Sequence, residues 1–80
     1  MHELGITRNL VAIVSDAAAG RRVNKVWLEI GEQSALLPDA VRFCFDVVSK
    51  GTALEAAALE IVRVRGDTLN IKAMEVESCA

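Results

Sequence analysis

The chain is short, weakly acidic and rich in apolar residues. Its 80 residues, 52% of them hydrophobic, suffice for one small domain, at a size where core building is marginal. A net charge of -2, scattered basic residues and few aromatic residues argue against a nucleic-acid-binding surface. No apolar run is long enough to span a membrane and no signal-peptide pattern is present, so we expect a single cytoplasmic domain over residues 1–80.

The first three residues, Met1, His2 and Glu3, include the only histidine and could chelate a metal ion. If Met1 is retained, which the bulky His2 favours, its amine, the His2 amide nitrogen and the His2 imidazole can form fused chelate rings around one ion. A planar nitrogen set suits Ni(II) or Cu(II) better than Mg(II) or Ca(II). Glu3 can add its carboxylate or its amide nitrogen. The competing interpretation is a lone terminal histidine without a function.

A helix is predicted from Leu4 to Ala19, ending at Gly20. Its apolar positions recur at helical spacing: Ile6, Leu10, Ile13, Val14 and Ala17. A strand is predicted from Val23 to Ile30, because Val26, Leu28 and Ile30 alternate with Lys25, Trp27 and Glu29. This alternation indicates one buried face and one polar or partner-covered face.

A second helix is predicted from Pro38 to the cap at Gly51. Its apolar stripe, widened by Phe43 and Val47, predicts burial on more than one side; the stripe itself is Val41, Cys44, Phe45 and Val48. Cys44 within that stripe is interpreted as a buried structural thiol rather than a nucleophile, since no histidine is near it in sequence. Asp39 is a first-turn charge favoured by the helix dipole, with a nearby metal carboxylate as the alternative.

Two further strands follow. Residues 53–58 are alanine-rich and helical by propensity, 59–64 predict a strand, and Arg65-Gly66-Asp67 predicts a tight turn. A third strand starts at Leu69 and shifts phase at Ala73-Met74, which indicates a bulge. We expect the last two strands to form a hairpin. The predicted fold is α+β, with two helices on one face of a three-stranded, mainly antiparallel sheet in the order α-β-α-β-β.

The sequence contains no recognisable catalytic pattern. It has no Ser-His-Asp set, no glycine-rich phosphate loop and no dinucleotide fingerprint. A single histidine at the N-terminus has no neighbouring residue in sequence that would orient it as a general base. We therefore do not expect an enzyme.

Several segments, in order along nearly the whole chain, resemble the HypA/HybF family of hydrogenase nickel incorporation proteins. They are MHEL at residues 1–4, VWLEIGE at 26–32, AVRFCFD at 40–46, KGT at 50–52, LEI at 59–61 and GDTLNIKAMEVE at 66–77. The resemblance implies a domain of two helices and three strands that binds Ni(II) through Met1, His2 and Glu3. It also implies delivery of nickel, with a HypB-type GTPase, to the nickel–iron hydrogenase large subunit, and in some relatives to urease.

The sequence departs from the family pattern at one place. The resemblance implies a zinc module with two Cys-x-x-Cys pairs between the last two strands, whereas here Val64 to Asp67 joins them directly. Cys44 and Cys79 cannot replace four thiolates, so zinc is not expected. The short connection also suggests that the third strand could pair with a neighbouring chain, which would give a strand-swapped homodimer.

The alternative function is a protein-interaction module without a metal of its own. Such a shortened HypA relative would act through its sheet edges or dimer contacts. The feature that supports it is Trp27, between Lys25 and Glu29 on the outer face of the first strand. A lone tryptophan there is either an interface anchor or a side chain packed under a helix.

Overall fold

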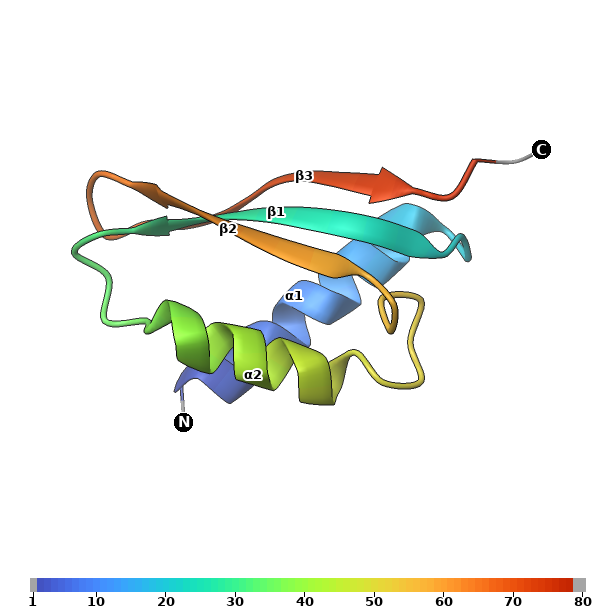
Figure 1. Ribbon diagram of the computed structural model, residues 1–80, viewed down its shortest axis with the longest axis horizontal. Coiled ribbons are helices and arrows are strands. Elements are labelled where there is room, and N and C mark those ends of the chain that lie inside the picture. The colour runs from blue at the N-terminus through green and yellow to red at the C-terminus, as the bar shows by residue number, and fades with distance from the viewer. Residues whose placement is uncertain (1, 79–80) are drawn as a thin grey trace.

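A computed structural model describes residues 2–78, with only the backbone of His2, so Met1 and Cys79 lie outside the described residues. The order of the elements is as predicted: α1 (His2–Ala18), β1 (Val23–Gly31), α2 (Pro38–Val48), β2 (Ala58–Val64) and β3 (Leu69–Val76). Both helices lie on the same side of the three-stranded sheet (Figure 1). No helix in this part of the chain is long and apolar enough to cross a membrane. The predicted α+β class is confirmed.

The strand order is β2-β1-β3, so the predicted hairpin between the last two strands is wrong. β1 pairs in parallel with β2 and antiparallel with β3, and β3 therefore runs opposite to both other strands. The reason is α2, which joins β1 to β2 as a helical crossover and so places β2 parallel to β1. One side of β1 is then occupied, and β3 pairs on the other side.

The short link from β2 to β3 crosses the end of β1. Its backbone is fixed by three hydrogen bonds of 2.8 Å, donated by the N–H groups of Gly31, Glu32 and Gln33 to the carbonyls of Thr68, Val64 and Gly66. Gly31 leaves no space beneath this link. A Cβ there would collide with the Gly66 carbonyl oxygen and lie 2.6 Å from the Gly66 carbonyl carbon and 2.9 Å from the Asp67 Cα.

The core lies between β1 and the two helices. Val26, Leu28 and Ile30 are fully buried, as the alternation predicts. The buried face of α1 is made by Thr7, Leu10, Val11, Val14 and Ala18. This buried face differs from the predicted stripe: Ile13 and Ala17 were expected in it, but Ile13 is 59% exposed and Ala17 is exposed too. Thr7 is tolerated in the core because its hydroxyl donates to the Glu3 carbonyl one turn earlier.

α2 is covered on one side only, which corrects the expected burial on two sides. Val41 and Phe45 are buried, whereas Phe43 is 70% and Val47 51% exposed. With two layers in the molecule, no element covers the outer side of α2 within residues 2–78. Cys44, predicted to be buried, is half-buried.

The connection after α2 and the third strand each differ slightly from prediction. Residues 53–57 form turns rather than a helix, and Leu54 inserts into the core. The predicted bulge in β3 is confirmed one residue earlier, between Ile71 and Ala73. Its extra residue lets both halves of β3 keep their apolar side chains half-buried in the core.

α1 ends in two residues with left-handed backbone, Ala19 (φ 54) and Gly20 (φ 86). Gly20 is the predicted stop, but Ala19 carries a Cβ in a conformation that costs about 1–2 kcal/mol. Ala19→Gly is therefore expected to raise the free energy of unfolding by about 0.5–1 kcal/mol, measured by urea denaturation. The matched change Ala17→Gly, inside the helix, should lower it by about 1 kcal/mol. Equal losses in both variants would contradict the strain at Ala19.

Candidate functional site

The beginning of α1 lies beside the beginning of α2 (Figure 1). The contact is made by Glu3, whose carboxylate oxygen Oε2 accepts a 3.5 Å hydrogen bond from the Leu37 N–H. Leu37 directly precedes α2, and its side chain is 64% exposed. Glu3 is half-buried. The first turn of α1 is thus anchored to the body of the domain and remains open to solvent.

The position of His2 as the first residue of α1 makes its backbone nitrogen available. The first four N–H groups of a helix have no intrahelical acceptor, and here they include those of His2 and Glu3. A metal ion can take these nitrogens without breaking a helical hydrogen bond. The helix dipole opposes a cation at this end. Negative charge from Glu3 and from deprotonated amides would offset it.

The predicted metal-binding residues are only partly described. Met1 lies outside the described residues, and for His2 only the helical backbone is given. Glu3 contacts Leu37 at the start of α2. Asp39, two residues after Leu37, is exposed in the first turn of that helix. Among the side chains that the structure describes, those of residues 3–78, no three of His, Cys, Asp or Glu gather as a metal-binding cluster. The metal role of Met1, His2 and Glu3 therefore stays a prediction.

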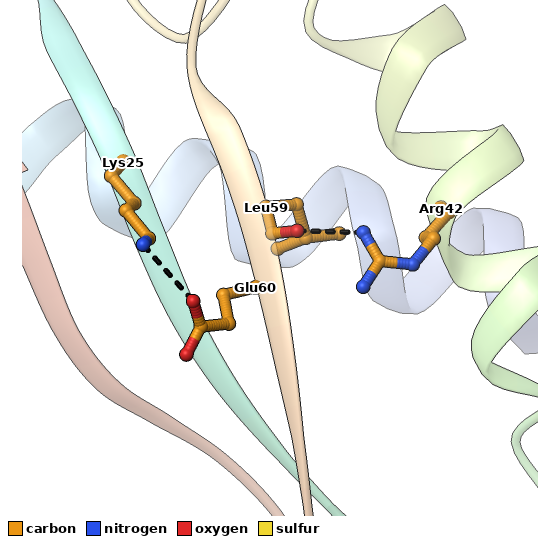
Figure 2. A network of polar contacts seen from close by, with 4 residues as sticks. All are labelled: Lys25, Arg42, Leu59 and Glu60. Atoms are coloured by element: carbon orange, nitrogen blue, oxygen red, sulfur yellow. Dashed lines mark hydrogen bonds and ion pairs between the residues drawn. The ribbon is translucent and has the colours of Figure 1, made fainter.

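The outer face of the sheet presents a second group of functional candidates. Trp27 is half-buried, and the Lys25 ammonium lies 4.7 Å from its ring centroid. The same ammonium pairs with Glu60 of β2 at 3.0 Å (Figure 2). Because both helices cover the opposite face, Trp27 does not pack under a helix. The sequence alone did not decide whether Trp27 packs under a helix. It also did not predict the ion pair with Glu60, because the parallel pairing of β1 with β2, which places Glu60 near Lys25, was not predicted.

Comparison with known proteins decides the family. Residues 1–76 match the family model described as hydrogenase/urease nickel incorporation, metallochaperone, HypA. The chain belongs to the HypA family. The match includes the N-terminal residues and both helices, and it confirms the resemblance drawn from the sequence.

Curated HypA relatives are longer than this chain. The hydrogenase maturation factor HypA of Nostoc sp. (strain PCC 7120) is 64% identical over 66 residues, which are 82% of this chain and 58% of that protein. That of Geobacter sulfurreducens is 52% identical over 66 residues, 60% of its length. The chain thus spans less than two thirds of these relatives.

A solved structure shares the fold. The solution structure of the Ni metallochaperone HypA from Helicobacter pylori aligns with a TM-score of 0.71. The alignment covers 95% of this chain and 93% of that one, at 16% sequence identity. At this identity the likeness supports the HypA fold for residues 2–78, and it carries no residue assignments.

Proposed function

We propose that this chain is the nickel-binding domain of a metallochaperone for hydrogenase maturation. Ni(II) is its cargo, held by the Met1 amine, the His2 amide and imidazole, and Glu3. The main support is the family match over residues 1–76, which includes these three residues. A HypB-type GTPase and the maturing nickel–iron hydrogenase large subunit are the proposed partners in delivery.

The local chemistry agrees with a site that both binds and releases nickel. The amine, amide and imidazole nitrogens are borderline ligands that suit Ni(II). The unpaired N–H groups at the start of α1 supply the amide nitrogen at no cost in helical hydrogen bonds. The hydrogen bond from Leu37 to Glu3 uses only one carboxylate oxygen, Oε2, and we propose that the other oxygen, Oε1, contacts the ion. Leu37, which contacts Glu3, is 64% exposed, and this leaves a partner room to approach and remove the ion.

The electronic state of bound nickel tests this ligand set. A planar nitrogen environment is expected to give a diamagnetic Ni(II) complex, with sharp NMR signals and an absorption band typical of square-planar nickel. The measurement is a Ni(II) titration followed by absorption and proton NMR, with Mg(II) as the control ion. A paramagnetic, six-coordinate complex would contradict the proposed nitrogen set and would indicate oxygen ligands.

The uncovered sheet face is the proposed contact for a protein partner. Trp27 lies on the central strand of this face, and the Lys25 ammonium lies over its ring. Tryptophan is among the residues that most often anchor protein interfaces. Trp27→Ala is expected to weaken binding of a HypB-type GTPase by about tenfold or more while Ni(II) affinity is unchanged. Surface plasmon resonance measures the first and calorimetry the second. The control is Phe43→Ala, which removes an exposed aromatic side chain on α2. Equal losses of GTPase binding in the two variants would contradict the assignment of Trp27 as the partner contact.

A further inference from the structure

The two edges of the sheet are treated differently. The outer edge of β2 is blocked by Arg42 of α2, whose guanidinium donates to the Leu59 carbonyl at 2.6 Å. Figure 2 shows this side chain on the side of β2 away from β1. Among the described side chains, those of residues 3–78, none donates in this way to the backbone of β3, the other edge strand. β3 is therefore the edge available for pairing.

The hydrogen bonds at the ends of β3 show which of its backbone groups face away from the sheet. Gly31 donates to the Thr68 carbonyl, and Glu77 donates to the Arg22 carbonyl, so residues 68 and 77 face β1. Backbone groups alternate in direction along a strand. Leu69 and Val76 therefore face outward, and so do Ile71 and Met74, since the bulge between Ile71 and Ala73 takes up the odd residue.

These four outward-facing positions are symmetrical about the middle of the strand. The same four residues carry the half-buried apolar side chains of β3. Asn70, Lys72, Ala73 and Glu75 between them are exposed. Because of the bulge, the strand has the same pattern of apolar and polar positions when read in either direction.

We propose that β3 pairs antiparallel with β3 of a second copy of this chain, around a two-fold axis between Lys72 and Ala73. Leu69 then lies opposite Val76 of the second copy, and Ile71 opposite its Met74. In each such pair the outward-facing N–H and C=O groups meet, and both side chains lie on the helical face of one continuous sheet. A shift by one residue would place apolar side chains opposite polar ones.

Charge and apolar surface agree with a second copy as the occupant. Lys72 lies diagonal to Glu75 of the second copy, and this opposite-charge contact occurs twice because of the symmetry. Beside β3, Ile6 and Ile13 of α1 line an apolar groove of about 310 Å³ with Leu69 and Ile71. Pairing brings Met74 and Val76 of the second copy to the rim of this groove. It would thus cover Ile13, which is 59% exposed in one chain.

Sedimentation equilibrium with charge variants tests the pairing. The chain is expected to dimerise, and Glu75→Lys should raise the dimer Kd by about tenfold or more, because two diagonal attractions become repulsions. The double variant Lys72→Glu/Glu75→Lys should restore the Kd to within about threefold of the original. Asp46→Lys, the same charge change on α2, is the control. A chain that stays monomeric up to about 1 mM, or a dimer equally weakened by Asp46→Lys, would overturn the proposal.

Disulfide cross-linking tests the register. In a background with Cys44 and Cys79 changed to serine, Lys72→Cys mixed with Ala73→Cys should cross-link faster than either variant alone. The reason is that positions 72 and 73 of the two copies are directly opposite, whereas identical positions are not. Equal rates in all samples would reject this register. A dimer that fails to cross-link at these positions would indicate exchange of β3 between chains and would also overturn the proposal.

Discussion

Replacing Gly31 by alanine is expected to lower the free energy of unfolding by about 3 kcal/mol. A Cβ at this position collides with the backbone of Gly66 and Asp67, and none of the three atoms that it meets belongs to a flexible side chain. The link between β2 and β3 must therefore move. Its hydrogen bonds to Gly31 and Gln33, both 2.8 Å, would lengthen with it. Overpacking and weakened hydrogen bonds act in the same direction.

Urea denaturation followed by Trp27 fluorescence measures this loss, and Trp27 is the only tryptophan in the chain. The matched control is Gly5→Ala in α1, where the added Cβ has no described atom within 4 Å apart from its chain neighbours and the adjoining backbone of its own helix. That change should stabilise the chain by up to about 1 kcal/mol, since alanine favours the helix. If Gly31→Ala unfolds at the same urea concentration as the original chain, the link does not press on β1.

Gly31 also shows what the sequence could not reveal about the sheet. The alternation from Val23 to Ile30 correctly predicted a strand, which in the structure includes Gly31 as its last residue. The alternation cannot tell which strands are neighbours, because each strand of a sheet obeys the same period of two. The short turn at Arg65-Gly66-Asp67 favoured a hairpin. In the structure the same turn passes over the end of β1 and joins two strands that do not pair.

Helix positions were predicted more accurately than the faces that they bury. Pro38 and Gly20 marked their boundaries because each has a backbone preference independent of tertiary structure. Ile13 and Phe43 were expected in the core and are exposed. Burial of an apolar helical residue depends on what packs against it, and with two layers each helix has one covered side. The exposed apolar residues therefore identify surfaces available for partners.

The candidate metal site was predicted from ligand chemistry and family resemblance together. Neither the helical spacing nor the composition distinguishes His2 from a terminal histidine without a function. The structure adds the start of α1 at His2 and the contact between Glu3 and Leu37. These features place the first turn against the body of the domain. A terminal segment fixed in this way loses less conformational entropy when it binds an ion.

The decisive prediction for nickel binding is that His2→Ala weakens Ni(II) affinity by at least about a hundredfold, or 2.7 kcal/mol. The imidazole is the strongest side-chain ligand in the proposed set, and its loss opens a chelate ring. Acetylation of the Met1 amine should have a comparable effect, because it removes another nitrogen of the same set. Calorimetry at constant pH measures both. Protons compete with Ni(II) for the imidazole nitrogen, so affinity in the original chain should also fall as the pH is lowered toward about 6.

Two carboxylate variants separate the role of Glu3 from that of Asp39. Glu3→Gln keeps an oxygen that can accept from Leu37 and removes the charge, so a loss of about threefold to tenfold would reflect direct electrostatic support of the ion. Asp39→Asn should leave Ni(II) affinity within about twofold, since Asp39 is exposed in the first turn of α2 and is favoured there by the helix dipole. Unchanged affinity after His2→Ala would remove the N-terminal site from consideration. A large loss of Ni(II) affinity after Asp39→Asn would contradict the N-terminal nitrogen set. It would indicate that oxygen ligands between the two helix N-termini hold the ion.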